Sequence, residues 1–244
     1  MYKYELHCHT SESSRCGQTS ASDMADFYKK AGYTGLVITD HFLNGNTTVP
    51  KDLPWEEKIE LYCKGYEEAK KRGDEIGLDV FFGFEFSGDF VVLGLGKEWL
   101  KEHKDLDKLV RSDFFETVHK DGGYIIHAHP FRESPYTKIL QVFPRQVDAI
   151  ETINAVNTDF ENNIANFIAE QYKVTKACGT DNHIGLRKTL ASLEIDFRAK
   201  NIDELINAMK NNLHSVKQYD AKEENGEVIL TEHIPELDCG GRND

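Results

Sequence analysis

The chain has 244 residues, of which 39% are hydrophobic and 11% aromatic, enough for a sizeable buried core. Its formal net charge of −13 argues against a broad basic surface for long nucleic acid or anionic membranes. The five cysteines form no C-x-x-C pair, which argues against a disulfide scaffold or a zinc finger. No leader peptide and no apolar run of the ~18 residues that cross a bilayer is visible, so we expect a cytoplasmic protein without a membrane partner.

Short apolar runs alternate with longer amphipathic stretches from the N-terminus onward. The first run, 4–8, precedes a helical pattern from about Ala21 to Ala31 that Ser20 or Ser22 could cap. Further strands are expected at 35–39, 80–84, 90–95, 123–126, 148–153, 174–178 and 190–195, with 90–95 as a hairpin partner. Further helices are expected at 55–76, 104–120, 160–171 and 202–211.

This alternation predicts an α/β fold with parallel strands joined by right-handed crossovers. Six or seven such units can close into a barrel of one domain, and an open doubly wound sheet is the alternative. We expect the barrel to occupy residues 1–220 and the polar segment 221–244, which ends in Cys-Gly-Gly-Arg-Asn-Asp, to be partly disordered.

Ligand-type side chains follow the predicted strands, at the point where each strand ends. They form the motifs His7-Cys8-His9, Asp40-His41, Glu85, His127-Ala128-His129-Pro130 and Asp181-Asn182-His183. Because the carboxyl ends of parallel strands share one face of a barrel, these motifs can converge in space. Residues at i and i+2 on a strand point the same way, so His7 and His9 can bind one metal with Cys8 turned aside. Imidazoles with carboxylates suit Zn²⁺, Mn²⁺ or Fe²⁺.

Each motif alone has an ordinary structural explanation. A histidine at a strand end is often only hydrogen-bonded, Asp40-His41 can form an Asx-type turn, and His129 can simply precede an X-Pro bend. The occurrence of all five motifs at corresponding strand ends favours a metal centre.

As an ordered set, these motifs resemble those of the polymerase and histidinol phosphatase (PHP) superfamily. The resemblance covers about residues 2 to 190 and implies a distorted (β/α)7, TIM-like barrel that hydrolyses phosphoesters with two or three divalent metal ions. Carried over by position, His7, His9, Glu85 and Asp181 hold one metal, Glu85 bridges to a second that His129 also binds, and His41 and His183 serve a third.

Two positions depart from that pattern. Where many members offer a further histidine after H-x-H this chain has Arg15 and Cys16, and Cys16 is interpreted as a buried structural thiol rather than a ligand. Where they offer a histidine on the strand after the glutamate it has Val91 or a neighbour, for which His127 could compensate as a ligand or as a support of one. Glu151 and Asp40 are expected to orient ligand histidines.

The mechanistic hypothesis is attack on phosphorus by a metal-activated hydroxide. Arg132, three residues after His129, is the first candidate for a phosphate clamp, ahead of Arg15, and His183 or His41 could protonate the leaving group.

The substrate is expected to be a small phosphoester, such as histidinol phosphate or a nucleotide, with short nucleic acid open but less favoured. An amidohydrolase-type metal hydrolase is an alternative, although that architecture usually uses a bridging lysine in mid-chain. The other alternative is a non-catalytic PHP-like module that binds metal weakly and has a structural or interaction role.

Overall fold

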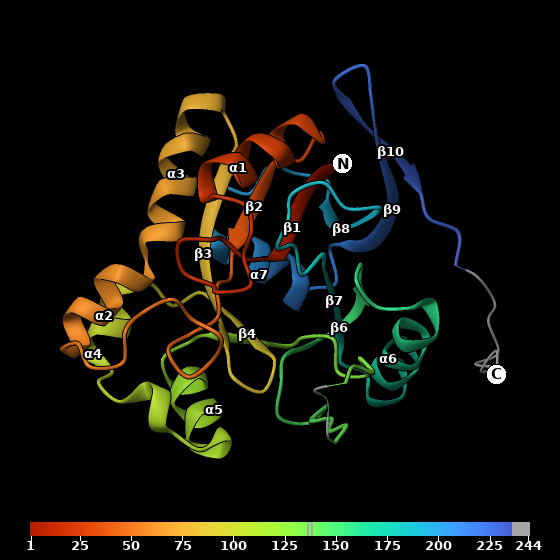
Figure 1. The fold of residues 1–244 in the computed structure, drawn as a ribbon. Helices are drawn as coiled ribbons and strands as arrows, with labels where there is room; N and C mark the ends of the chain where they lie inside the picture. Colours follow the sequence, from red (N-terminus) through yellow and green to blue (C-terminus); the bar gives the residue numbers. More distant parts are fainter. Residues whose placement is uncertain (136, 138, 236–244) are drawn as a thin grey trace.

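The computed structural model describes residues 1–135, 137 and 139–235, which form a mixed α/β fold around a large sheet (Figure 1). The strands lie in the order β10-β9-β8-β1-β2-β3-β4-β5-β6-β7. Their bounds are β1 Tyr2–Cys8, β2 Gly35–Ile38, β3 Asp79–Phe86, β4 Phe90–Leu93, β5 Tyr124–His127, β6 Ala149–Asn154, β7 Thr175–Gly179, β8 Thr189–Ile195, β9 Ser215–Glu224 and β10 Glu227–Glu232. The helices are α1 Ala21–Lys30, α2 Trp55–Tyr62, α3 Lys64–Ile76, α4 Lys97–Glu102, the 3₁₀ turn η1 Leu106–Lys108, α5 Arg111–Lys120, α6 Asp159–Tyr172 and α7 Ile202–Lys210.

Neighbouring strands are parallel in only part of the sheet. The sets β1–β2–β3 and β5–β6–β7 are parallel, as predicted. Strand β4 is antiparallel to both β3 and β5, as expected of a hairpin partner. Strand β8, expected among the parallel strands, is antiparallel to β1, so the expectation of a parallel strand was wrong there. The reason for β4 is the short connection at 87–89, because such a turn joins antiparallel strands whereas a parallel crossover needs about a dozen residues.

Strand β7, at one end of the strand order, approaches β1 without a continuous ladder. Strands β7 and β10 are outermost in the described order. The chain after β7 meets β1 at one isolated bridge between Cys8 and Asn182, where the His9 N–H donates to the Asn182 carbonyl oxygen at 2.8 Å. The described sheet is therefore not closed, and we refer to this junction as the β1–β7 seam.

The helical regions match the sequence pattern with three differences, the first being helix α4, which was not expected. Helix α1 begins after Ser20, whose hydroxyl accepts from the Asp23 N–H as a cap. The helix expected over 55–76 is broken at Cys63, because Ser13 donates its hydroxyl to the Tyr62 carbonyl oxygen at 2.7 Å. The helix expected over 104–120 begins only at Arg111, after η1. No helix in the described ranges is long and apolar enough to cross a membrane.

The helices cover the sheet from outside. Figure 1 shows α1 and α3 side by side over one part of the sheet, while α6 packs on β6 and α5 on β5. An aromatic cluster that includes Phe42, Phe84 and Phe114 fills the space beneath α2 and α5. These layers hold the carboxyl ends of β1, β3, β5 and β7 in fixed relative positions.

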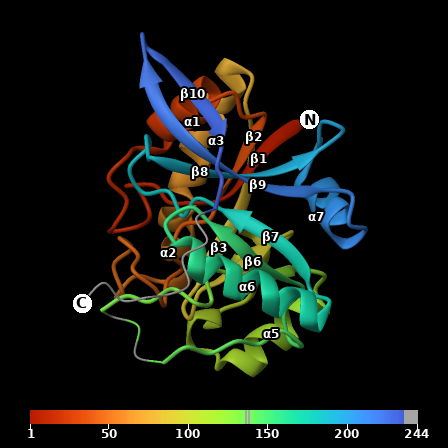
Figure 2. The same cartoon turned by 90° about the vertical axis from the view of Figure 1, so that its right-hand side faces the viewer.

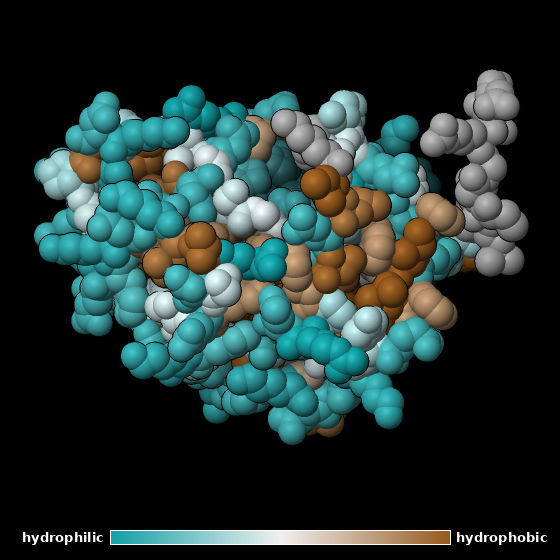
Figure 3. Space-filling view, turned by 90° about the horizontal axis from the view of Figure 1, so that it is seen from below, coloured by the Kyte–Doolittle hydropathy of each residue, from teal (hydrophilic) through white to brown (hydrophobic). Residues whose placement is uncertain are grey.

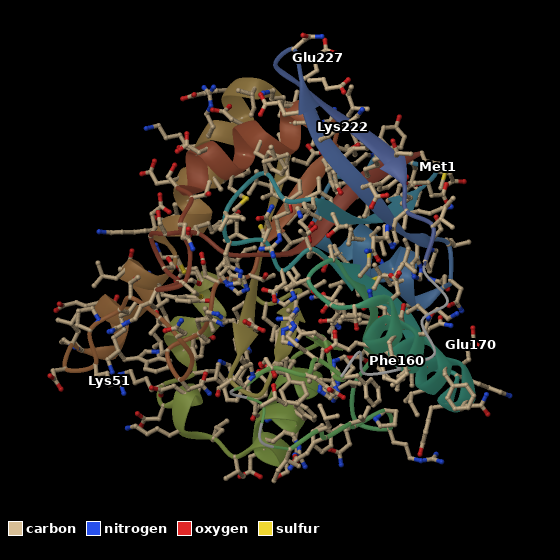
Figure 4. The ribbon with its side chains drawn as sticks, turned by 45° about the vertical axis from the view of Figure 1, so that its right-hand side comes forward. Met1, Lys51, Phe160, Glu170, Lys222 and Glu227 are labelled. Atoms are coloured by element: carbon tan, nitrogen blue, oxygen red, sulfur yellow. The ribbon has the colours of Figure 1, made fainter. Side chains whose placement is uncertain are left out.

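The C-terminal region continues the sheet beyond the boundary expected near residue 220. Strand β9 crosses that boundary and pairs with β10, and Figure 2 shows the hairpin extending from the body of the protein. Its turn is Asn225-Gly226, with φ of 52° and 83°, which is the pair of positive angles that a type I′ hairpin needs. Figure 4 labels Lys222 and Glu227 beside this turn, away from α6. Residues 236–244, with Cys239, lie outside the described residues.

Candidate metal centre

Four short segments bring the predicted ligands together. His7 and His9 lie at the end of β1, Glu85 near the end of β3, His129 just after β5, and Asp181 just after β7. The i, i+2 spacing places both β1 histidines on one side, and Cys8 points away to donate its thiol to the Val37 carbonyl oxygen at 3.3 Å.

The nitrogen and oxygen atoms of these side chains converge on one point. The Nε2 atoms of His7 and His9 lie 3.1 Å apart. Asp181 Oδ1 is 3.6 Å from the first nitrogen and 3.2 Å from the second. Glu85 places Oε1 3.5 Å from His7 Nε2 and Oε2 3.6 Å from His9 Nε2. This is a set of imidazole nitrogens and carboxylate oxygens around a common centre.

These residues fit divalent metal ions. The Glu85 carboxylate is buried among imidazoles, with Oε1 3.6 Å from His129 Nε2 and Oε2 2.5 Å from His41 Nδ1. A buried carboxylate surrounded by imidazole nitrogens is a donor set that a divalent cation can bind. Imidazole and carboxylate ligands suit zinc, manganese or iron.

The predicted ligands fall into overlapping groups whose ligand atoms lie within 4.8 Å of one another. These groups are His7, His9 and Glu85; His7, His129 and Asp181; Glu85, Asp89 and His129; and His9, His41 and His183. All seven predicted ligands belong to at least one group. In Figure 4, side chains that carry nitrogen atoms gather between the strands, while the labelled Lys51 and Glu170 lie at the periphery.

Asp89 is a candidate ligand that the sequence analysis missed. It lies in the β3–β4 turn, and its carboxylate joins Glu85 and His129. Val91, where the family pattern would place a histidine, is instead buried in the core with 2% of its surface exposed. The sequence did carry a signal for Asp89, since it follows Gly88 and lies four residues after Glu85. A Gly-Asp pair at that place indicates a tight hairpin turn, which brings the aspartate side chain back toward the end of β3.

Cys16 differs from its interpretation as a buried structural thiol. It is only partly buried and lines the same cavity as His41 and His183. Burial raises the pKa of Cys16, but the neighbouring His183 and His41 outweigh burial and lower it to about 6. The thiol therefore faces the site on the side of the third histidine group.

Two buried carboxylates orient the histidines, in the roles expected for them. Glu151 accepts from His7 Nδ1 at 3.1 Å with one oxygen and from the His129 backbone N–H at 2.8 Å with the other. Asp40 acts through Ser14, whose hydroxyl donates to Asp40 at 2.7 Å and lies 3.2 Å from His9 Nδ1. Both arrangements turn an Nε2 atom toward the centre.

In the absence of metal, burial and the neighbouring charges shift the pKa values of the side chains in the cluster. Burial raises the pKa of Glu85, but His41, His129 and His7 outweigh burial and hold it well below its ordinary value. Burial lowers the pKa of His41, yet the adjacent Glu85 raises it to about 11. Burial, helped by the charge on His41, lowers the pKa of His9 to about 3. Near neutral pH the metal-free cluster therefore holds His41 protonated and His9 neutral.

Three residues of the cluster adopt left-handed backbone conformations. The φ angles are 69° at Asp89, 29° at His129 and 52° at Asp181. Positive φ costs energy in residues other than glycine and tends to gather at functional sites. Here it turns each side chain back over the end of its strand.

The cluster forms one wall of a cavity of about 560 Å³. Arg132 and Arg187 both line it, together with Val156 and Ile184, which are 40% and 42% exposed. Figure 3 shows hydrophobic side chains exposed among hydrophilic ones on one face of the protein. Arg132 donates Nη1 to Asp181 Oδ2 at 2.5 Å. Arg15 instead donates to the Thr47 carbonyl oxygen and does not line this cavity.

His127 does not join the cluster. Its ring stacks against Phe143, with centroids 5.7 Å apart, and against Phe90 at 4.9 Å. The distortion at His129 breaks the i, i+2 relation between the two histidines, so His127 does not replace the missing strand histidine as a ligand.

Comparisons with known proteins show the fold. No protein-family model matches the sequence, and no curated protein matches it. A two-domain protein from Bacteroides vulgatus, described as containing a predicted PHP-like metal-dependent phosphoesterase, superposes with a TM-score of 0.65 and 15% identity over 88% of this chain. This chain spans 64% of the length of that protein.

Two further structures share the fold. PsfC from Pseudomonas syringae gives a TM-score of 0.59 at 16% identity, covering 88% of this chain and 90% of that one. An amidohydrolase from Chromobacterium violaceum with bound sulfate gives 0.50 at 14% identity, covering 84% of this chain and 96% of that one. The chain therefore has the mixed α/β fold seen in PHP-like phosphoesterases and in a protein described as an amidohydrolase.

Proposed function

We propose that the chain is a metal-dependent phosphoesterase that hydrolyses a small phosphoester. The observation that supports this most directly is the convergence of four side chains, those of His7, His9, Glu85 and Asp181. The two Nε2 atoms lie 3.1 Å apart, and each lies 3.2–3.6 Å from an oxygen of both carboxylates.

The side chains present would hold two or three ions, as manganese, zinc or iron. His7, His9, Glu85 and Asp181 would hold the first ion. Glu85 would be shared with a second that Asp89 and His129 complete, and His41, His183 and Cys16 face a third position. When bound, such ions supply positive charge to the phosphoryl oxygens and acidify a water molecule.

The remaining side chains bind and orient the substrate. Arg132 is held by Asn154, Asn157 and Asp181 at 2.5–2.9 Å, which fixes its guanidinium on the cavity wall to meet a phosphoryl oxygen. His41 and His183 are partly exposed at the rim and would deliver a proton to the leaving oxygen.

Phosphoester chemistry fits the cavity better than amide chemistry. No lysine occurs among the described residues that line the metal cavity or the adjoining one, so the bridging lysine usual in amidohydrolases has no counterpart there. Three arginines occupy those linings instead: Arg111, Arg132 and Arg187. Arginine suits phosphate because its planar fork donates two hydrogen bonds at once.

The test is hydrolysis of p-nitrophenyl phosphate and of its bis-ester by the Mn²⁺-loaded protein, with bound metal counted by elemental analysis. We expect turnover that a chelator abolishes and that His9→Ala reduces at least 100-fold. Bound metal without turnover of any phosphoester would favour amide chemistry. No bound metal and no turnover would favour a non-catalytic module and would end the proposal.

A further inference from the structure

A second cavity, of about 260 Å³, adjoins the metal cavity and is not used by the mechanism above. The two share Asp89, His129 and Arg132 in their linings, so a molecule bound at the cluster can extend into the second cavity without crossing the fold. We call it the side cavity. Its other walls come from β4, β5, the start of α5 and residues 139–143.

The side cavity is lined by a cation that has no anionic partner among the described residues. Arg111, the exposed first residue of α5, lies over the ring of Phe143 with its guanidinium carbon 3.5 Å from the ring centroid. Within the described part of the chain its hydrogen-bond partner is Gln141, at a long 3.5 Å. No carboxylate in residues 1–135 or 139–235 forms an ion pair with it, although the chain carries 42 acidic residues.

A lining residue of the side cavity also carries a buried polar atom that has no partner among the described residues. His127 lines it, has only 3% of its surface exposed, and is held between the rings of Phe90 and Phe143. Its Nδ1 atom makes no hydrogen bond with any described residue. An unsatisfied buried group of this kind costs about 1–3 kcal/mol unless something outside the protein satisfies it.

We infer that the side cavity binds the leaving group of the substrate and that this leaving group carries a second anion, a carboxylate or a phosphate. Arg111 supplies the charge for it and His127 a hydrogen bond. This inference rests on the proposed function, because it needs the phosphoryl group of the same molecule to lie at the metal cluster. Asp89 lines both cavities, but its carboxylate groups with Glu85 and His129 as a candidate metal ligand. Its negative charge is therefore directed toward the metal cluster and not toward an anion in the side cavity.

Non-hydrolysable phosphonates test this without relying on turnover. Calorimetry with the Mn²⁺-loaded protein would compare alkylphosphonates of two to four carbons with the matched carboxyalkylphosphonates and with the matched bisphosphonates. At one chain length we expect the second anion to tighten Kd by about tenfold, as one charge-assisted hydrogen bond would. The compound that gains distinguishes carboxylate from phosphate.

Three variants assign the gain to the side cavity. Arg111→Gln should abolish it while changing the Kd of the plain alkylphosphonate less than twofold. Arg145→Gln is the matched control, because Arg145 also lies over an aromatic ring, that of Tyr172, but does not line the cavity, and it should keep the gain. His127→Phe preserves an aromatic ring in the stack and should reduce the gain severalfold.

The outcomes separate this inference from the proposed function. If plain alkylphosphonates bind but no second anion tightens binding, or if the gain survives Arg111→Gln, the side cavity is not an anion site. A gain that depends only on chain length would make the cavity an apolar site and would also overturn the inference. If alkylphosphonates do not bind and p-nitrophenyl phosphate is not hydrolysed, the proposed function fails and the inference fails with it.

Discussion

Glu151 supports two candidate ligands at once, so its replacement by glutamine tests how the centre is built. One carboxylate oxygen accepts from His7 Nδ1 at 3.1 Å, and the other accepts from the His129 N–H and from Asn154 Nδ2, each at 2.8 Å. Glutamine keeps one acceptor oxygen and turns an NH₂ group toward the other partners. At least one hydrogen bond to a charged acceptor is lost, which is worth about 1.5–3 kcal/mol.

The effect on metal binding follows from the tautomer of His7. If the new amide faces His7, its ring proton must move from Nδ1 to Nε2, the atom that faces the cluster. Changes to such supporting partners typically weaken metal binding about 10–100-fold, or ~1.4–2.7 kcal/mol. We expect Glu151→Gln to weaken Mn²⁺ binding by that factor, measured by competition with a chromogenic chelator.

The matched control is Glu161→Gln. Glu161 is also a buried carboxylate and accepts from the Glu133 and Thr158 backbone N–H groups, but it belongs to the capping box of α6 and to no ligand group. It should lower the melting temperature with little change in Mn²⁺ affinity. Unchanged Mn²⁺ affinity in Glu151→Gln, or an equal loss in Glu161→Gln, would refute the assignment of Glu151 as a support of the centre.

Three other perturbations have defined outcomes. In the metal-free protein the raised pKa of His41, about 11 against 6.5, contributes stability that is complete below pH 6.5 and is lost as pH rises toward 11. The lowered pKa of Glu85, the partner in the same pair, contributes stability present above pH 4.5 and lost below it. The pair therefore stabilises this form most near pH 4.5–6.5, so we expect the melting temperature to fall from pH 6.5 to 9, and a rise over that range would contradict this. Gly179→Ala would place a Cβ 2.3 Å from that of His7, so we expect a loss of roughly 1–3 kcal/mol in urea unfolding and weaker metal binding, whereas wild-type values for both would show that the backbone gives way. Cys16, with its pKa lowered to about 6, should react with iodoacetamide at pH 7 severalfold faster than an ordinary thiol, and added Zn²⁺ should slow the reaction. Peptide mass spectrometry of a variant without the C-terminal cysteine would measure this. Modification unaffected by Zn²⁺ would place Cys16 outside the centre.

The convergence of the main candidate ligands followed from the sequence because strand periodicity determines which way these side chains point. His7 and His9 needed only an i, i+2 spacing on a strand, and Glu85 needed only to lie near the end of the next parallel strand but one. Such arguments use local geometry alone. They therefore hold even though the described sheet is partly antiparallel.

The same arguments failed where the backbone leaves regular geometry. At His129 a positive φ breaks the strand relation with His127, and at Asp89 a hairpin turn returns a carboxylate that no strand pattern predicts. The place of Arg111, which forms no ion pair with the described residues, could not be predicted either. It lines the side cavity because of where α5 packs, and that packing depends on tertiary contacts rather than on periodicity. The β9–β10 hairpin was readable from Asn225-Gly226 and was overlooked in a polar segment.

The β1–β7 seam gives the centre a mechanical role in addition to a chemical one. On one side of the seam stand His7 and His9, and on the other Asp181, with the single bridge between Cys8 and Asn182 beneath them. An ion held by these three side chains would cross-link residues that lie more than 170 positions apart in the chain. Emptying the centre would then open the fold first along this line, and hydrogen exchange at the His9 and Asn182 amides would report the opening before any other part of the sheet.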